Sequence, residues 1–111
     1  VPVPPLRDGL SDRVPSIRRA AAVALAHRGD ASGRAVLIAA LATAPSIAVV
    51  EALGAIGDDE AIVALGRCAM RHTAFAPSVI AALRDTGNAR AGRLAARLEA
   101  ERAPQTTGKA P

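Results

Sequence analysis

The sequence predicts an all-α fold, a short right-handed α-solenoid of about three stacked antiparallel helix pairs, and three observations support this prediction. An Ala-Leu pair followed by Gly-Asp or Gly-Asn occurs three times, and the glycines of successive copies lie 28 and 30 residues apart. Pro-Ser followed by Ile or Val precedes each copy. The segments between these marks have the apolar spacing of helices, and a period near 30 residues is typical of stacked helix pairs. The copies are Ala24-Leu25 with Gly29-Asp30, Ala52-Leu53 with Gly57-Asp58, and Ala82-Leu83 with Gly87-Asn88.

Each Gly-Asp or Gly-Asn is expected to form the turn between the two helices of a pair. Glycine adopts the left-handed conformation that closes a helix at little steric cost. The Asp or Asn that follows carries a side-chain oxygen that can cap the next helix. Each repeated proline fits the first turn of a helix, where its missing N–H needs no partner, so Pro15, Pro45 and Pro77 should open the first helix of each pair.

These marks place the elements in order along the chain. The sequence predicts a short stub at 5–10, followed by helices at 15–28, 31–42, 45–56, 59–71, 77–86 and 89–102. The opening helix shortens along the chain, because the distance from proline to leucine falls from ten residues to eight and then six. The connection from His72 to Ala76 is the longest.

Composition and length indicate one small domain. We expect an extended N-terminal segment at 1–5, a repeat domain at 6–102 and a disordered tail at 103–111. The chain has 28 alanines and a single aromatic residue, Phe75, so the core should consist of Leu, Ile, Val and Ala in closely packed helices. The stub resembles the second half of a unit, which favours a portion of a longer array or multidomain protein; the alternative is a complete small domain.

The first unit resembles the HEAT repeat, in particular the short bacterial type named after phycobilisome lyases. The matching residues are Leu6, Leu10, Asp12, Pro15, Ile17-Arg18, Ala20-Ala21, Leu25 and Gly29-Asp30. The second unit keeps Leu37, Leu41, Pro45, Ile47, Leu53 and Gly57-Asp58, with Thr43 and Ala48 in place of the aspartate and arginine. The third keeps Pro77, Val79, Leu83 and Gly87-Asn88. The resemblance implies an α-solenoid whose second helices line a concave surface, and it implies that Asp12 and Arg18 tie a turn together.

Charge is distributed unevenly along the chain. The net charge is +4, with +3 in residues 1–28, −4 in residues 29–66 and +5 in residues 67–111. The predicted second helices place several arginines in equivalent rows, and we expect them to form a basic end of the concave surface, unpaired with the acids at 58–60. The candidate partner-binding residues are Arg67, Arg71, Arg90, Arg93 and Arg97. The alternative is a solvated helix face in which Arg97 pairs with Glu101.

No catalytic, metal or cofactor signature emerges from the remaining residues. The acids at 58–60 begin a helix, where capping explains them better than metal binding. Cys68 lies among apolar residues and is expected to be buried. His72 is four residues away, but no acid or oxyanion donor accompanies a Cys/His dyad. A zinc site of ordinary ligand number cannot be assembled. We therefore predict no cofactor and no enzymatic activity.

The sequence favours a protein–protein interaction or scaffolding module that holds a peptide or partner domain on its concave face. The alternative is electrostatic binding of a polyanion, either nucleic acid or an acidic partner, along the arginines. Nucleic acid is weakly supported because Trp and Tyr are absent. A regulatory subunit of an enzyme is a third possibility. No membrane partner is expected, since the longest apolar run has eight residues and a bilayer needs about 20. The compartment stays unknown, with a cytoplasmic location favoured.

Overall fold

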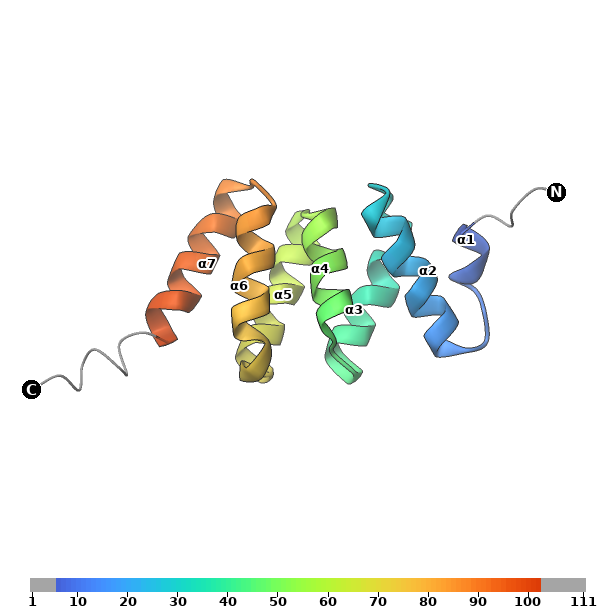
Figure 1. Cartoon of the computed structure of the whole chain (residues 1–111), viewed down its shortest axis with the longest axis horizontal. Helices are drawn as coiled ribbons and strands as arrows, with labels where there is room; N and C mark the ends of the chain where they lie inside the picture. Colours follow the sequence, from blue (N-terminus) through green and yellow to red (C-terminus); the bar gives the residue numbers. More distant parts are fainter. Residues whose placement is uncertain (1–5, 103–111) are drawn as a thin grey trace, which may run out of the picture.

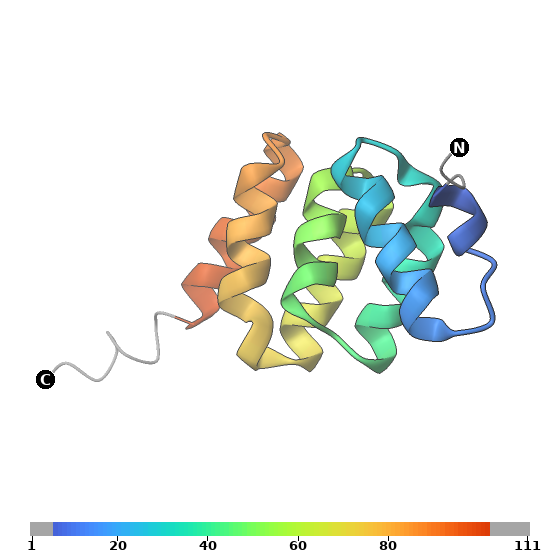
Figure 2. The same ribbon diagram turned by 45° about the vertical axis from the view of Figure 1, so that its right-hand side comes forward.

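The computed structural model describes residues 6–102, which form helices stacked in two layers (Figures 1 and 2). The elements are α1 (Leu6–Gly9), α2 (Pro15–His27), the 3₁₀ turn η1 (Ala31–Gly33), α3 (Arg34–Thr43), α4 (Ile47–Ile56), α5 (Asp59–Arg71), the 3₁₀ turn η2 (Thr73–Phe75), α6 (Ala76–Asp85) and α7 (Ala89–Arg102). Helices α2, α4 and α6 lie side by side in one layer, while α3 and α5 lie behind them and α7 packs behind α6. The described chain is therefore an all-α solenoid, as predicted. The segments predicted at 1–5 and 103–111 lie outside the described residues.

The three Gly-Asp or Gly-Asn turns have the predicted conformation. Gly29, Gly57 and Gly87 have φ angles of 83°, 65° and 73°, all in the left-handed region that favours glycine. The carboxylate of Asp58 accepts a hydrogen bond of 2.9 Å from the Ala61 N–H at the start of α5. Asp30 caps η1 in the same way, and Asn88 accepts from the first turn of α7. The repeated motif thus ends one helix and begins the next.

The prolines depart from the prediction in the second unit. Pro15 opens α2 and Pro77 lies in the first turn of α6, but α4 begins at Ile47, with Ser46 as its cap. The Ser46 hydroxyl accepts a hydrogen bond from the Val49 N–H at 3.3 Å. Pro45 therefore precedes the helix rather than opening it, because a capping serine occupies the intervening position. The sequence pattern therefore located the turn before α4 but placed the helix start at Pro45 instead of Ile47.

Two connections also contain structure that periodicity did not reveal. Residues 31–33 form a 3₁₀ turn, so α3 begins at Arg34, and the long connection after α5 contains η2. Arg18 ties the turn before α2, as expected, but through the backbone: its guanidinium donates to the carbonyl oxygens of Asp12 and Arg13 at 2.7 and 3.2 Å. The Asp12 carboxylate instead accepts from the Val14 N–H at 2.8 Å.

Small residues allow successive first helices to approach closely. Ala52, Leu53 and Gly54 of α4 are buried, and Ala52 is fully inaccessible. A Cβ atom added at Gly54 would lie only 2.9 Å from the Cβ of Ala82 in α6. The core is aliphatic, and among the described residues no charged or polar side chain is buried. Close helix contact compensates for the scarcity of large aromatic residues, of which Phe75 is the only one in the sequence.

Candidate functional site

The acidic cluster at 58–60 is occupied by structural contacts. Asp58 caps α5 and also forms an ion pair with Arg34, at the start of α3. The Nε of Arg34 lies 3.5 Å from Glu60 as well. On the other side, Nη1 of Arg90 in α7 lies 3.1 Å from the Asp59 carboxylate. The cluster therefore links the first turns of three neighbouring second helices.

The pairing of Arg90 corrects one prediction. We expected this guanidinium to be free of the acids at 58–60, yet it contacts Asp59. The physical reason is register: the N-termini of α5 and α7 lie side by side in the second layer, so opposite charges in their first turns face each other. Both side chains are largely exposed, and such a pair contributes little to stability. It nevertheless neutralises one of the five candidate arginines.

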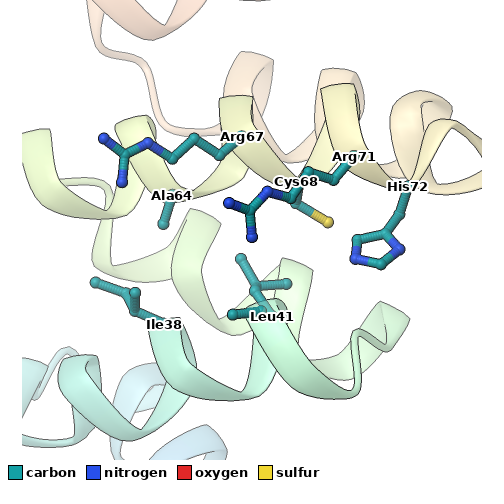
Figure 3. Close-up of a pocket in the computed structure, with 8 residues that line it drawn as sticks. Ile38, Leu41, Ala64, Arg67, Cys68, Arg71 and His72 are labelled. Atoms are coloured by element: carbon teal, nitrogen blue, oxygen red, sulfur yellow. The ribbon is translucent and has the colours of Figure 1, made fainter.

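A pocket lies between α3 and α5, and we call it the α3–α5 pocket (Figure 3). It is lined by Ile38, Leu41, Ala42, Ala64, Arg67, Cys68, Arg71 and His72. Its volume is about 130 Å³. Ile38 and Leu41 form one wall from α3, while Ala64 and Cys68 face them from α5. The side chains of Arg67 and Arg71 extend in the same direction along the α5 side of this apolar interior.

Arg67 and Arg71 are exposed, and neither forms an ion pair with another described residue. They lie four residues apart, so one turn of α5 presents both on the same flank. No acidic residue occurs in α3, and the last acid of α5 is Glu60, which faces Arg34. No carboxylate of α3 or α5 therefore compensates the charges of Arg67 and Arg71.

The other two candidates lie on α7. Arg93 is exposed and forms no ion pair within residues 6–102, whereas Nε of Arg97 lies 4.0 Å from Glu101. This contact is the intrahelical pair considered from the sequence, and its partners are 77% and 60% exposed. Solvent screening makes such a pair weak. That Arg93 and Arg97 form one basic surface with Arg67 and Arg71 stays a prediction.

Cys68 is buried, as expected, with 3% of its surface accessible. Burial raises the pKa of this thiol above its ordinary value, because desolvation disfavours the thiolate. His72 lines the same pocket just after α5 ends at Arg71; its backbone N–H donates to the Cys68 carbonyl oxygen at 2.8 Å, and no hydrogen bond joins its imidazole to the thiol. A buried neutral thiol is a poor nucleophile. Within residues 6–102 there is also no group of three His, Cys, Asp or Glu side chains that could hold a metal ion.

The first-helix layer carries a wider groove of different character. It has a volume of about 410 Å³ and is lined mainly by α4 and α6, with Glu51 and Asp85 as its acidic groups, and His27 of α2 also contributes to the lining. Its walls include Gly54 and Ala82, which pack against each other across the two helices. No unpaired cation borders an apolar interior there. The α3–α5 pocket is therefore the better candidate site.

A family model described as HEAT repeats matches residues 3–84. The chain belongs to this family, and the match covers the first two units and most of α6. Comparison with curated proteins and with solved structures gave no significant match. In the described part of the chain, no helix is both long and apolar enough to cross a membrane. HEAT repeats commonly serve as protein-interaction scaffolds and are generally not catalytic.

Sequence reasoning named Arg67 and Arg71 but missed the pocket beside them. Ile38 and Leu41 belong to one repeat unit, and Ala64 and Cys68 belong to the next. Nothing in the local spacing shows that the intervening side chains leave a space. The available signal was the pairing of small residues, Ala42 and Ala64, on second helices of adjacent units. Small residues on facing helices can either bring the helices together or leave a gap, and only the packing decides between these outcomes.

Proposed function

We propose that this protein is a protein–protein interaction or scaffolding module that binds a partner on the surface formed by α3, α5 and α7, the expected concave face. The observation that carries the proposal is that two arginines without an ion-pair partner among the described residues, Arg67 and Arg71, lie beside an apolar pocket. Membership of the HEAT repeat family supports it, since these repeats are commonly interaction scaffolds. The partner-binding set is Arg67, Arg71, Arg93 and Arg97, with Arg90 held by Asp59. The protein itself is not an enzyme on this proposal.

Electrostatic binding of a polyanion is the second candidate function. The excess positive charge of residues 67–111 favours it. The structure offers less support than the sequence did, because Arg34 and Arg90 are both engaged with the acidic cluster. A polyanion following the first turns of the second helices would meet these acids. The phycobilisome-lyase subtype remains a further prediction, carried only by the residue pattern of the first unit.

Site-specific photo-crosslinking in the source cells tests the proposed surface. A photoreactive residue at Ala42, exposed on α3 beside the pocket, should capture a partner protein. The matched control is Ala48, exposed on α4 in the other layer. The captured protein, once purified, should bind the wild-type chain directly. Equal capture from both positions, or from neither, would contradict the proposal.

Charge reversal tests the arginine surface, and salt dependence distinguishes the two candidate functions. Arg67→Glu/Arg93→Glu/Arg97→Glu should leave the helical content unchanged in circular dichroism, because exposed substitutions usually cost under about 0.5 kcal/mol each. It should abolish or strongly weaken binding of the purified acidic partner. Binding of a polyanion would fall steeply and linearly with salt on logarithmic axes, whereas a mixed protein interface depends on salt much less.

A further inference from the structure

We infer that the α3–α5 pocket accepts one leucine-sized side chain from an acidic amphipathic helix of the partner, while two of that helix's carboxylates pair with Arg67 and Arg71. This inference rests on the proposed function and specifies the chemistry of the partner. Its starting point is the composition of the pocket. Ile38, Leu41 and Cys68 supply apolar surface, and the lining contains no carboxylate.

The size of the pocket limits what can enter it. A volume of about 130 Å³ is close to the roughly 150 Å³ of an apolar protein cavity that admits a benzene-sized group. An isobutyl group fits such a space. Arg67 and Arg71 are among the residues that line the pocket, so a side chain bound there would lie beside these two arginine side chains.

Charge selects the rest of the ligand. Arg67 and Arg71 have no ion-pair partner among the described residues, and no acid follows Glu60 in α5. Guanidinium groups bind carboxylates through paired, charge-assisted hydrogen bonds. A basic ligand would be repelled at this position, and a neutral ligand would form no ion pair with either guanidinium group. Charge complementarity therefore favours an acidic partner segment.

The spacing of the arginines favours a helical ligand. Arg67 and Arg71 are one turn apart on α5, so the matching carboxylates should also lie about one turn, or roughly 6 Å, apart. In an extended segment, two carboxylates at that spacing are separated by one residue, whose side chain points to the opposite face. That residue could not enter the pocket. In a helix, glutamates three residues before and one residue after a leucine share one flank beside it.

Titration of isotope-labelled full chain with short end-blocked peptides tests this inference by NMR. The parent peptide is helical and has one leucine with glutamates three residues before and one residue after it. It should shift the amide signals of Ile38, Leu41 and Cys68. Replacing the leucine with glutamine should weaken binding about tenfold or more, since a buried leucine contributes at least that much. Replacing both glutamates with glutamine should have a comparable effect.

Two protein variants make the test specific to the pocket. Ala64→Leu fills the pocket without changing its charge, and Arg67→Glu/Arg71→Glu reverses the charge of the two residues beside it. Each variant should bind the parent peptide at least about tenfold more weakly. The control Arg13→Glu/Arg28→Glu makes the same charge change at exposed positions around α2 and should retain binding. A native-like amide spectrum of each variant shows that it is folded.

The inference is overturned if the parent peptide does not bind, if the leucine-free peptide binds equally well, or if Ala64→Leu has no effect. It is also overturned if a DNA oligonucleotide displaces the peptide and binds more tightly, which would identify the arginines as a polyanion site. Failure of the peptides alongside specific capture from Ala42 would refute only this partner chemistry. Failure of both experiments would refute the proposed function as well.

Discussion

The contact between Gly54 and Ala82 should limit which residues the first-helix layer accepts. Gly54 lies inside α4, where alanine is normally the better helix former, yet a Cβ atom at this position would lie 2.9 Å from the Ala82 Cβ and 3.2 Å from the Ala82 carbonyl oxygen. Both atoms are fixed to the backbone of α6, so no rotamer change can relieve the contact. Gly54→Ala therefore requires α4 and α6 to move apart.

Two opposing terms set the magnitude of this effect. Helix propensity favours alanine over glycine by about 0.8 to 1 kcal/mol. Overpacking a close contact costs about 1 to 3 kcal/mol. We expect Gly54→Ala to lower the free energy of unfolding by about 1 kcal/mol, with a fall in Tm of about 4 °C for a chain of this size.

The reciprocal exchange tests the reasoning, with urea unfolding followed by circular dichroism. Ala82→Gly alone should destabilise by about 1 kcal/mol through lost propensity. In Gly54→Ala/Ala82→Gly the two propensity changes offset each other, and the methyl group moves to the opposite side of the same space. The loss of unfolding free energy in the double variant should thus be smaller, by about 1 to 2 kcal/mol, than the sum of the losses in the two single variants. Stabilisation by Gly54→Ala alone, or strict additivity, would refute the close-contact argument.

The remaining predictions concern the core, a turn and the buried thiol. Ala52→Leu should destabilise by about 1 to 3 kcal/mol in urea unfolding, whereas Ala55→Leu on the exposed side of α4 should change stability by under about 0.5 kcal/mol; equal effects would mean that α4 is rotated. Gly57→Val should destabilise by about 1 to 2 kcal/mol or more, because φ is 65° and a β-branched residue is strained there, and an unchanged Tm would contradict the proposed turn. Cys68 ionises more readily in the unfolded chain, since burial raises the pKa of its thiol in the folded one. Stability should therefore fall as pH rises above the ordinary thiol pKa, and Cys68→Ala should remove that part of the loss; identical pH profiles would show that burial does not control this thiol.

The sequence by itself determined the fold class and the turns. Gly29, Gly57 and Gly87 identify left-handed positions, and the Asp or Asn after each glycine identifies a helix start. These are local requirements of backbone geometry and hydrogen bonding, so they can be read without knowing what lies opposite.

Only the tertiary structure decided which charged groups are free and where space remains between helices. Arg90 and Arg67 were equivalent candidates in the sequence, yet Arg90 faces Asp59 across adjacent helices and Arg67 borders the α3–α5 pocket. Neither outcome is encoded in local spacing, because ion pairing and cavity volume depend on how side chains from different repeat units meet. The repeat motif specifies each unit, while the close packing between units defines the surface available to a partner.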